Sequence, residues 1–304
     1  MGLFQISGDK LAEVPENDFG KEKELQKLVE TNLKELFGLT FISSELVVEG
    51  YRIDTLAYDP ETQSFVILEY KRDTNFSVID QGMHYFRIAQ NRKADLALKF
   101  NLSQKKNSSV EDFDWSQVKV LFIAKSFTSY QISAAGFKDL PIELWEIRRY
   151  SKEILEVNQL ETGTKVDMPE SKQKISADLT KEVKTYTAED HFTFRRAPML
   201  DLYEIFRDKL LSIDSRIKEA PTKYYIGFGI NRRIFCAIRP YVDKLALDLN
   251  RVKPEDLDDP LKKVHYRDRS MEFYNKHISE TDIRSEKDIS YVISLARQVF
   301  EKTY

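Results

Sequence analysis

The sequence is poor in the features that mark several classes of protein. Its one cysteine, Cys236, excludes a disulfide within the chain and a zinc site built from cysteines. No apolar run approaches the roughly 20 residues that cross a bilayer, which excludes a transport role within the membrane. Residues 1–7 lack a basic stretch followed by a long apolar stretch. We therefore expect no signal peptide and a cytoplasmic location.

The sequence also lacks an excess of charge of one sign. With 47 Lys and Arg against 50 Asp and Glu, the formal net charge is −3, which excludes a basic coat for nucleic acid. A site for a polyanion must therefore be a local patch. The 19 Phe and 15 Tyr residues argue against bulk disorder. A length of 304 residues predicts two domains.

The first half of the chain predicts an α/β domain with a mixed sheet. Apolar residues at helical spacing predict a helix that starts after Asn17 and Asp18 and stops at Gly38. A second helix is expected from Ser77, whose side chain can cap it, to about Arg92. The order α-β-β-β-α-β-α-β implies a mixed sheet flanked by helices. The remaining elements are strands at 45–51, 52–59, 64–71, 118–124 and 142–147, and a short helix at 129–138.

The second half predicts a smaller α+β domain. The polar, aperiodic stretch 161–190 is interpreted as a linker between a first domain, 1–160, and a second domain, 191–304. The role of the second domain is unknown, and substrate binding is one hypothesis. Its expected elements are a helix at 200–217, strands at 223–230, 233–239 and 244–250, and a closing helix at 286–302.

Three charged residues carry the chemistry. Glu69 and Lys71 end an apolar strand and, at i and i+2, leave the same face of it. If 60–63 form a four-residue hairpin loop, counting back along the two strands pairs Asp54 with Glu69. Carboxylates roughly 4.5–5.5 Å apart repel unless one is protonated or a cation lies between them. We therefore predict a Mg²⁺ or Mn²⁺ site at Asp54 and Glu69, with Lys71 to activate or orient water.

These residues resemble the motif of a known enzyme superfamily. Asp54, with the E-x-K formed by Glu69 and Lys71, resembles the PD-(D/E)XK nucleases, and segment 52–56 looks most like the NucS and RecB-type branch. The residue before Asp54 is Ile rather than Pro. The resemblance covers about the first 150 residues and implies a restriction-endonuclease-like core. The second half resembles a C-terminal domain of uncharacterised role found in such proteins.

The resemblance implies roles for further residues near the metal. It makes Asp54, Glu69 and the backbone carbonyl of Tyr70 the expected metal ligands. An acidic residue on the first helix often completes such sites. Glu22 is favoured for this role, with Glu24 as the alternative, and an acid that favours the start of a helix is the simpler interpretation of either one.

Other candidates lie on the second helix and among the arginines. The resemblance implies a glutamine after the E-x-K strand, and Gln81 fits, with Tyr85 one turn further on the same face. A solvent-facing Gln81 is the alternative. His84 is interpreted as a packing or phosphate-contact residue, since no second His or Cys lies nearby. The candidates for nucleic-acid contacts are Arg52, Arg72, Tyr85, Arg195, Arg196, Arg232 and Arg233.

The second half is less informative. Its arginines alternate with aromatic residues, among them Phe192, Tyr225 and Phe235, and a basic aromatic surface for nucleic acid is one interpretation. A buried β-face with arginines at the strand ends is the alternative, and we favour it. Cys236 is expected to be a buried small hydrophobe.

The leading hypothesis is a Mg²⁺- or Mn²⁺-dependent nuclease that hydrolyses phosphodiester bonds, in DNA in the first place. One alternative is a catalytically silent nucleic-acid or protein-interaction module that keeps the fold, with Glu69 and Lys71 as a plain surface ion pair. Another is an RNA-cleaving enzyme, although nothing in the sequence identifies a reader of the 2′-hydroxyl. We expect nucleic acid as the partner and no membrane, and we leave open a homodimer and endo- or exonucleolytic action.

Overall fold

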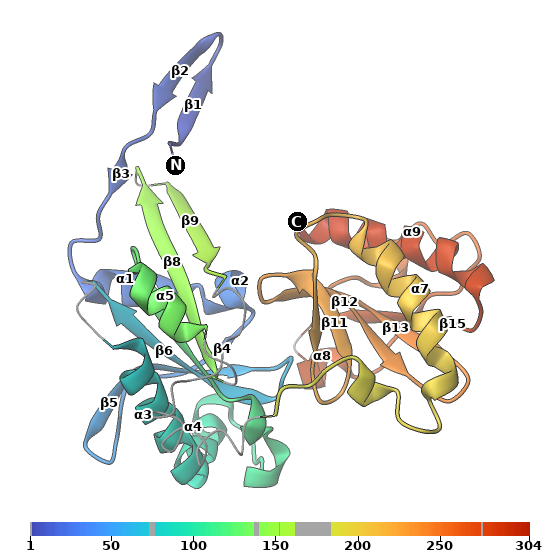
Figure 1. Ribbon diagram of the computed structural model, residues 1–304, viewed down its shortest axis with the longest axis horizontal. Helices are drawn as coiled ribbons and strands as arrows, with labels where there is room; N and C mark the ends of the chain where they lie inside the picture. Colours follow the sequence, from blue (N-terminus) through green and yellow to red (C-terminus); the bar gives the residue numbers. More distant parts are fainter. Residues whose placement is uncertain (1, 73–76, 137–139, 152, 162–183, 275) are drawn as a thin grey trace. The chain divides into compact units, whose positions relative to one another are not determined.

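The computed structural model describes the chain except for residues 1, 73–76, 137–139, 152, 162–183 and 275 (Figure 1). The chain forms two compact units. The first comprises Met1–Asp59 and Gln63–Lys184, and the second comprises Pro60–Thr62 and Thr185–Tyr304. Most of the predicted linker, 161–190, lies outside the described residues. The short segment Pro60–Thr62, which belongs to the second unit, was expected within the first domain.

The first unit has a mixed sheet, as the element order predicts. The strand order is β3-β8-β7-β6-β5-β4, with β9 paired to β8. The pairs β6–β7 and β7–β8 are parallel, and the others are antiparallel. The strands are β3 (Glu16–Asn17), β4 (Thr40–Val48), β5 (Tyr51–Asp59), β6 (Ser64–Lys71), β7 (Lys119–Ala124), β8 (Ile142–Tyr150) and β9 (Ile154–Gln159).

Helices pack on both faces of this sheet. One face packs against α1 (Glu22–Thr31) and α2 (Leu33–Phe37). The other face packs against α3 (Val78–Asn91), α4 (Lys93–Gln104) and α5 (Ser129–Ala135). Strand β6 therefore alternates between two cores, with Ile67 facing α3 and Leu68 facing α1. Both faces being covered explains why β6 and β7 are apolar almost throughout.

The hairpin β5–β6 has the register that its loop length predicts. Asp59 pairs with Ser64, and the ladder continues to the pair Thr55 and Leu68. One further step along both strands leads to Asp54 and Glu69. The prediction of strand 64–71 is confirmed at both ends, because the four-residue loop and the apolar pattern fix the same register.

The first helix differs from the prediction at its start and in its middle. It begins at Glu22 with Lys21 as its N-cap, so capping by Asn17 or Asp18 is wrong. The helix is interrupted at Asn32, whose side-chain amide donates to the Leu28 carbonyl over 2.8 Å and competes with the backbone. The second segment ends as predicted at Gly38, which has a left-handed φ of 70°.

Other boundaries and elements also differ. Strand β4 is longer than the predicted 45–51 and ends before a tight turn in which Glu49 and Gly50 both have positive φ. Helix α3 begins as predicted, since Ser77 accepts a hydrogen bond from the backbone N–H of Asp80 over 3.2 Å. The sequence did not predict α4, β3 or β9, nor the two strands that form a separate exposed hairpin, β1 (Phe4–Ser7) and β2 (Lys10–Glu13).

The second unit has a sheet of six antiparallel strands in the order β10-β11-β12-β13-β15-β14. Helices α7 (Leu200–Leu211) and α9 (Glu286–Thr303) share a core with this sheet, and Cys236 is buried there as expected. The predicted helix 200–217 is six residues too long. The strands are β10 (Lys218–Pro221), β11 (Ile226–Ile230), β12 (Arg233–Pro240), β13 (Leu245–Asn250), β14 (His265–Tyr266) and β15 (Ile278–Ile283), and α8 (Ser270–Tyr274) is a short helix.

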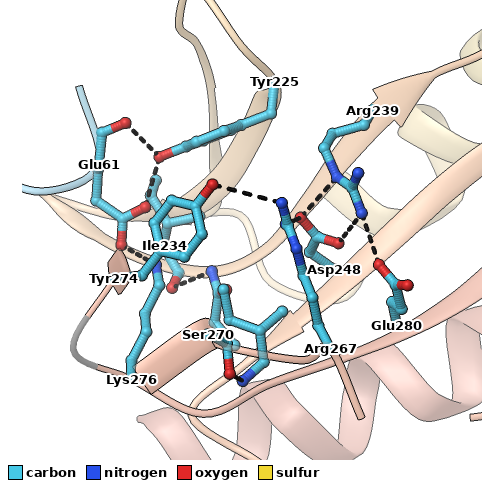
Figure 2. A network of polar contacts seen from close by, with 12 residues as sticks. Glu61, Tyr225, Ile234, Arg239, Asp248, Arg267, Ser270, Tyr274, Lys276 and Glu280 are labelled. Atoms are coloured by element: carbon cyan, nitrogen blue, oxygen red, sulfur yellow. Dashed lines mark hydrogen bonds and ion pairs between the residues drawn. The ribbon is translucent and has the colours of Figure 1, made fainter. Parts of the chain in front are cut away.

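Polar contacts organise part of the second unit (Figure 2). Arg239 on β12 binds Asp248 on β13 through two hydrogen bonds of 2.9 and 2.8 Å, and it also binds Glu280 on β15. Glu61 forms an ion pair with Lys276 and accepts a hydrogen bond from Tyr225. Each of these buried or half-buried charges therefore has a partner of opposite sign or a hydrogen-bond donor.

Candidate active site

Three predicted residues come together at the end of the hairpin β5–β6. Asp54 and Glu69 are both buried, with 7% and 5% of their surface exposed. The Lys71 ammonium lies 2.7 Å from Oε1 of Glu69, on the same side of β6. The carboxylate of Asp54 accepts a hydrogen bond from the backbone N–H of Tyr70 over 3.1 Å. The structure thus places the two acids and the amine together.

The two carboxylates are held where their charge is unfavourable. Burial raises the pKa of Asp54, and the Tyr70 N–H and the Lys71 charge only partly oppose this effect. Burial also raises the pKa of Glu69, and the nearby charge of Asp54 raises it further, while Lys71 acts in the opposite direction. A pair of acids that a single ammonium does not fully compensate is suited to receive a cation.

The donor atoms present fit a hard divalent cation. Oε2 of Glu69 is buried and accepts no hydrogen bond of normal geometry from a described residue, and the Tyr85 hydroxyl interacts with this carboxylate. In the part of the chain that the structure describes, no group of three or more His, Cys, Asp or Glu side chains could hold a metal. Two carboxylates together with water ligands are a donor set that fits Mg²⁺.

The structure distinguishes the two acids at the start of α1. Glu22 accepts a hydrogen bond from the backbone N–H of Arg72 over 3.1 Å, directly after Lys71. Glu24 instead binds Arg149 over 2.6 Å, which lowers its pKa. Residues two apart point about 200° apart around a helix, so the two acids cannot serve the same site. Glu22 is the acid that lies at the end of the E-x-K strand.

Sequence reasoning missed Gln26, which lies one turn after Glu22. Gln26 is buried, and its Nε2 lies 2.9 Å from the Asp54 carbonyl oxygen and 2.9 Å from the Glu30 carboxylate. Glu30 also accepts a hydrogen bond from the Thr55 hydroxyl over 2.6 Å. Polar residues at i, i+4 and i+8 beside an apolar stripe were the available signal. This network fixes α1 against the backbone of β5 at Asp54.

Helix α3, on the face of the sheet opposite α1, contributes Tyr85. Its hydroxyl donates to the Arg52 carbonyl over 3.3 Å, and burial and then the nearby Glu69 carboxylate raise its pKa. Gln81 lies one turn earlier on α3, and its amide oxygen is buried without a hydrogen-bond partner among the described residues. His84 packs its ring 4.0 Å from the ring of Tyr51, in agreement with a packing role.

The arginine candidates divide into two groups. Arg52 is largely exposed and lies 2.9 Å from Glu45, and Arg72 is exposed beside Glu22. The others lie in the second unit, where Arg195, Arg196 and Arg233 are exposed and Arg232 is half-buried. None of these positions tests a contact with nucleic acid.

A basic aromatic surface in the second unit does not form as a whole. Phe192, Tyr225 and Phe235 are buried, and Arg239 is engaged by Asp248. Of the three aromatic residues, Phe235 lies on β12 and packs into the core of the second unit. The buried interpretation thus holds for these three aromatic residues, whereas the neighbouring Phe194 and Tyr224 are exposed, at 95% and 45%.

A pocket of ≈ 240 Å³ adjoins the end of the E-x-K strand. Lys71 lines it and thus belongs both to the carboxylate pair and to the pocket. The other lining residues come from the segment before α1, from the first turns of α1 and from the residues that follow β6 and β7: Asp18, Phe19, Lys21, Glu22, Leu25, Arg72 and Lys125.

Comparison with known proteins finds a relative along the whole chain. A protein of Haemophilus influenzae, described as an uncharacterized protein, is 36% identical over 304 residues, which cover 99% of this chain and 100% of the relative. The chain belongs to the same family as this protein. No family model matches the chain.

Two solved structures resemble parts of the chain. An EndoMS–dsDNA2 complex is 17% identical over 47% of this chain and 49% of that chain, with a TM-score of 0.27. A repair endonuclease from Pyrococcus abyssi is 16% identical over 43% of this chain and 49% of that chain, with a TM-score of 0.25. The chain thus spans about half the length of each.

Among the described helices, none is long and apolar enough to span a bilayer.

Proposed function

We propose that the chain is a metal-dependent nuclease that hydrolyses phosphodiester bonds, in DNA in the first place. The observation that carries the proposal is the buried pair Asp54 and Glu69 with the Lys71 ammonium 2.7 Å from Glu69. Two buried acids beside an amine are costly to keep without a function. The cationic pocket that adjoins Lys71 gives an anionic substrate a place beside them.

Asp54, Glu69 and the backbone carbonyl of Tyr70 would hold Mg²⁺ or Mn²⁺. Such an ion, when bound, polarises a phosphoryl oxygen and makes a bound water more acidic. The buried Oε2 of Glu69, which accepts no hydrogen bond of normal geometry from a described residue, supports this assignment. The hydrogen bond from the Tyr70 N–H keeps the Asp54 carboxylate turned toward β6, where Glu69 lies.

The other residues act on the water and the phosphate. Lys71, positioned by Glu69, orients the attacking water and stabilises the negative charge that develops on the phosphorus oxygens. Glu22 accepts from the Arg72 N–H and so fixes the backbone directly after Lys71. Tyr85 on α3 lies beside Glu69, and Gln81, one turn earlier on the same helix, is the residue we assign to steady the site.

The test is a cleavage assay with the full chain and labelled linear, single-stranded and branched DNA, and single-stranded RNA. We expect cleavage of DNA in Mg²⁺ or Mn²⁺ and none in EDTA, with Lys71→Ala lowering the rate at least about 100-fold. Lys119→Ala is the matched control, since Lys119 forms a comparable 3.0 Å ion pair with Glu143 at the start of β7.

The other outcomes assign the alternatives. Absence of cleavage of every substrate, together with salt-sensitive DNA binding, would contradict the proposal in favour of a silent binding module. Cleavage of RNA alone would replace DNA as the substrate. Equal rates for wild type and Lys71→Ala would remove Lys71 from the mechanism.

A further inference from the structure

The pocket at the end of β6 is a concentration of positive charge in a chain that is negative overall. Four cationic side chains line it, against two carboxylates, while the whole chain has a formal net charge of −3. The cations are Lys21, Lys71, Arg72 and Lys125. They come from three separate segments of the sequence, which the fold brings together around the pocket.

The acids of the pocket are already engaged by its own groups. Asp18 binds Lys125 over 2.5 Å, and Lys125 also binds Glu16 over 2.8 Å. Glu22 accepts from the Arg72 backbone, which leaves the Arg72 guanidinium uncommitted by that bond. Lys21 and Arg72 are exposed and form no ion pair with any described residue. Lys71 and Lys125 are each paired with acids, so Lys21 and Arg72 supply the positive charge that the pocket offers to a ligand.

The pocket has the size and lining for more than a bare ion. A volume of ≈ 240 Å³ equals the liquid volume of about eight waters. Phe19 and Leu25 supply an apolar wall, and the Phe19 ring is held in place by the Arg149 guanidinium, 4.6 Å from its centre. Cations beside an apolar wall suit a phosphate that carries a sugar.

We propose that this pocket binds the phosphate and sugar of a nucleotide adjacent to the scissile phosphodiester bond, with Lys21 and Arg72 as phosphate-binding residues. This inference rests on the nuclease function proposed above. Lys71 sets the location, because it lines the pocket and contacts Glu69, so a strand that crosses the carboxylate pair runs on into the pocket. The phosphate can be an internal backbone phosphate or the phosphate at a strand end.

The test measures DNA binding and cleavage separately in the full chain. The variant is Lys21→Ala/Arg72→Ala, and Lys27→Ala, an exposed residue farther along α1, is the control. Binding of a labelled single-stranded oligonucleotide is followed by fluorescence anisotropy in EDTA at several salt concentrations. Loss of two phosphate contacts should lower the slope of log affinity against log salt by about 1.4. In Mg²⁺ we expect KM to rise at least about tenfold, with a smaller change in kcat.

Oligonucleotides with a 5′-phosphate or a 5′-hydroxyl distinguish the two sources of the phosphate. Equal losses for both assign the pocket to an internal phosphate, and a loss restricted to the 5′-phosphorylated strand assigns it to a strand end. If wild type cleaves DNA while the double variant matches Lys27→Ala in slope and KM, the pocket assignment is wrong and the nuclease function stands. If wild type neither binds nor cleaves any nucleic acid, the proposed function itself fails.

Discussion

The backbone N–H of Tyr70 donates a hydrogen bond to the Asp54 carboxylate over 3.1 Å, across the hairpin β5–β6. This bond links the position of one acid to the strand that carries the other. A slip of one residue between the strands would move Asp54 to the opposite face of the sheet. The geometry of the candidate site is therefore set by the register of one hairpin.

Removing one of the two acidic charges should stabilise the protein in the absence of metal. Because burial raises the pKa of Asp54 and of Glu69, their ionised forms oppose folding. We expect Asp54→Asn or Glu69→Gln in EDTA to gain about 0.5–2 kcal/mol, within the range of stabilising substitutions. Thermal unfolding at neutral pH measures this gain, with the exposed Glu35→Gln as the control.

The difference in stability between wild type and these variants has a defined pH dependence. The folded state binds these protons more tightly than the unfolded state, so the stability of wild type falls as pH rises from the ordinary carboxyl pKa through the raised values. The advantage of Glu69→Gln should therefore be absent at acid pH and widen toward neutral pH. An advantage that is constant between pH 4 and pH 8 would contradict this origin.

Gln26 should be important for stability and for the site. Gln26→Leu keeps the size of the side chain but removes the amide that donates to the Asp54 carbonyl and to the Glu30 carboxylate, which keeps its bond from Thr55. Loss of a donor to buried acceptors costs about 1–3 kcal/mol. Denaturant unfolding measures the cost, and Lys27→Ala on the exposed face of α1 should change stability by less than about 0.5 kcal/mol. Equal effects of the two substitutions would contradict a structural role for Gln26.

The ion pair of Glu61 with Lys276 should contribute more to stability than the exposed ion pairs do. Burial raises the pKa of Glu61, but the charge of Lys276 and the hydrogen bonds from Lys276 and Tyr225 together outweigh burial and lower the pKa. Lys276→Met removes the cation that contacts this buried charge, and we expect a loss of about 3–5 kcal/mol. The exposed pair Arg269 and Glu272 is the control, where Arg269→Ala should cost less than about 1 kcal/mol.

A double substitution checks the cause of that loss. Glu61→Gln/Lys276→Met removes both charges and should recover most of the stability, since the penalty arises from the uncompensated carboxylate. Chemical unfolding of the second unit is the measurement. A double variant as unstable as Lys276→Met alone would show that lost packing of the lysine stem, rather than charge, is responsible.

Local sequence patterns predict the register of the hairpin β5–β6. They do not predict the position of a side chain that depends on residues far away in the sequence. Loop length and apolar alternation fix the register that brings Asp54 toward Glu69. The choice between Glu22 and Glu24 depends on Arg149, 125 residues beyond Glu24. No local spacing carries that information, although it decides which acid faces Lys71.

Elements outside the core were missed for a related reason. Helix α4 has apolar residues around much of its circumference, among them the exposed Leu98 and Leu102, so it shows no clear amphipathic stripe. Strands β1 and β2 are exposed throughout, and no buried face marks their period. The segment Pro60–Thr62 reads as a simple turn, yet Glu61 joins the second unit through Lys276 and Tyr225.

The most direct test of the proposed metal site is to measure Mn²⁺ binding to wild type and to Glu69→Gln by electron paramagnetic resonance. DNA cleavage by the two proteins is measured in parallel. The geometry of Asp54 and Glu69 predicts a bound ion in wild type, at least about tenfold weaker binding in the variant, and loss of cleavage with it. Equal Mn²⁺ affinity in the two proteins would contradict a metal site at this hairpin.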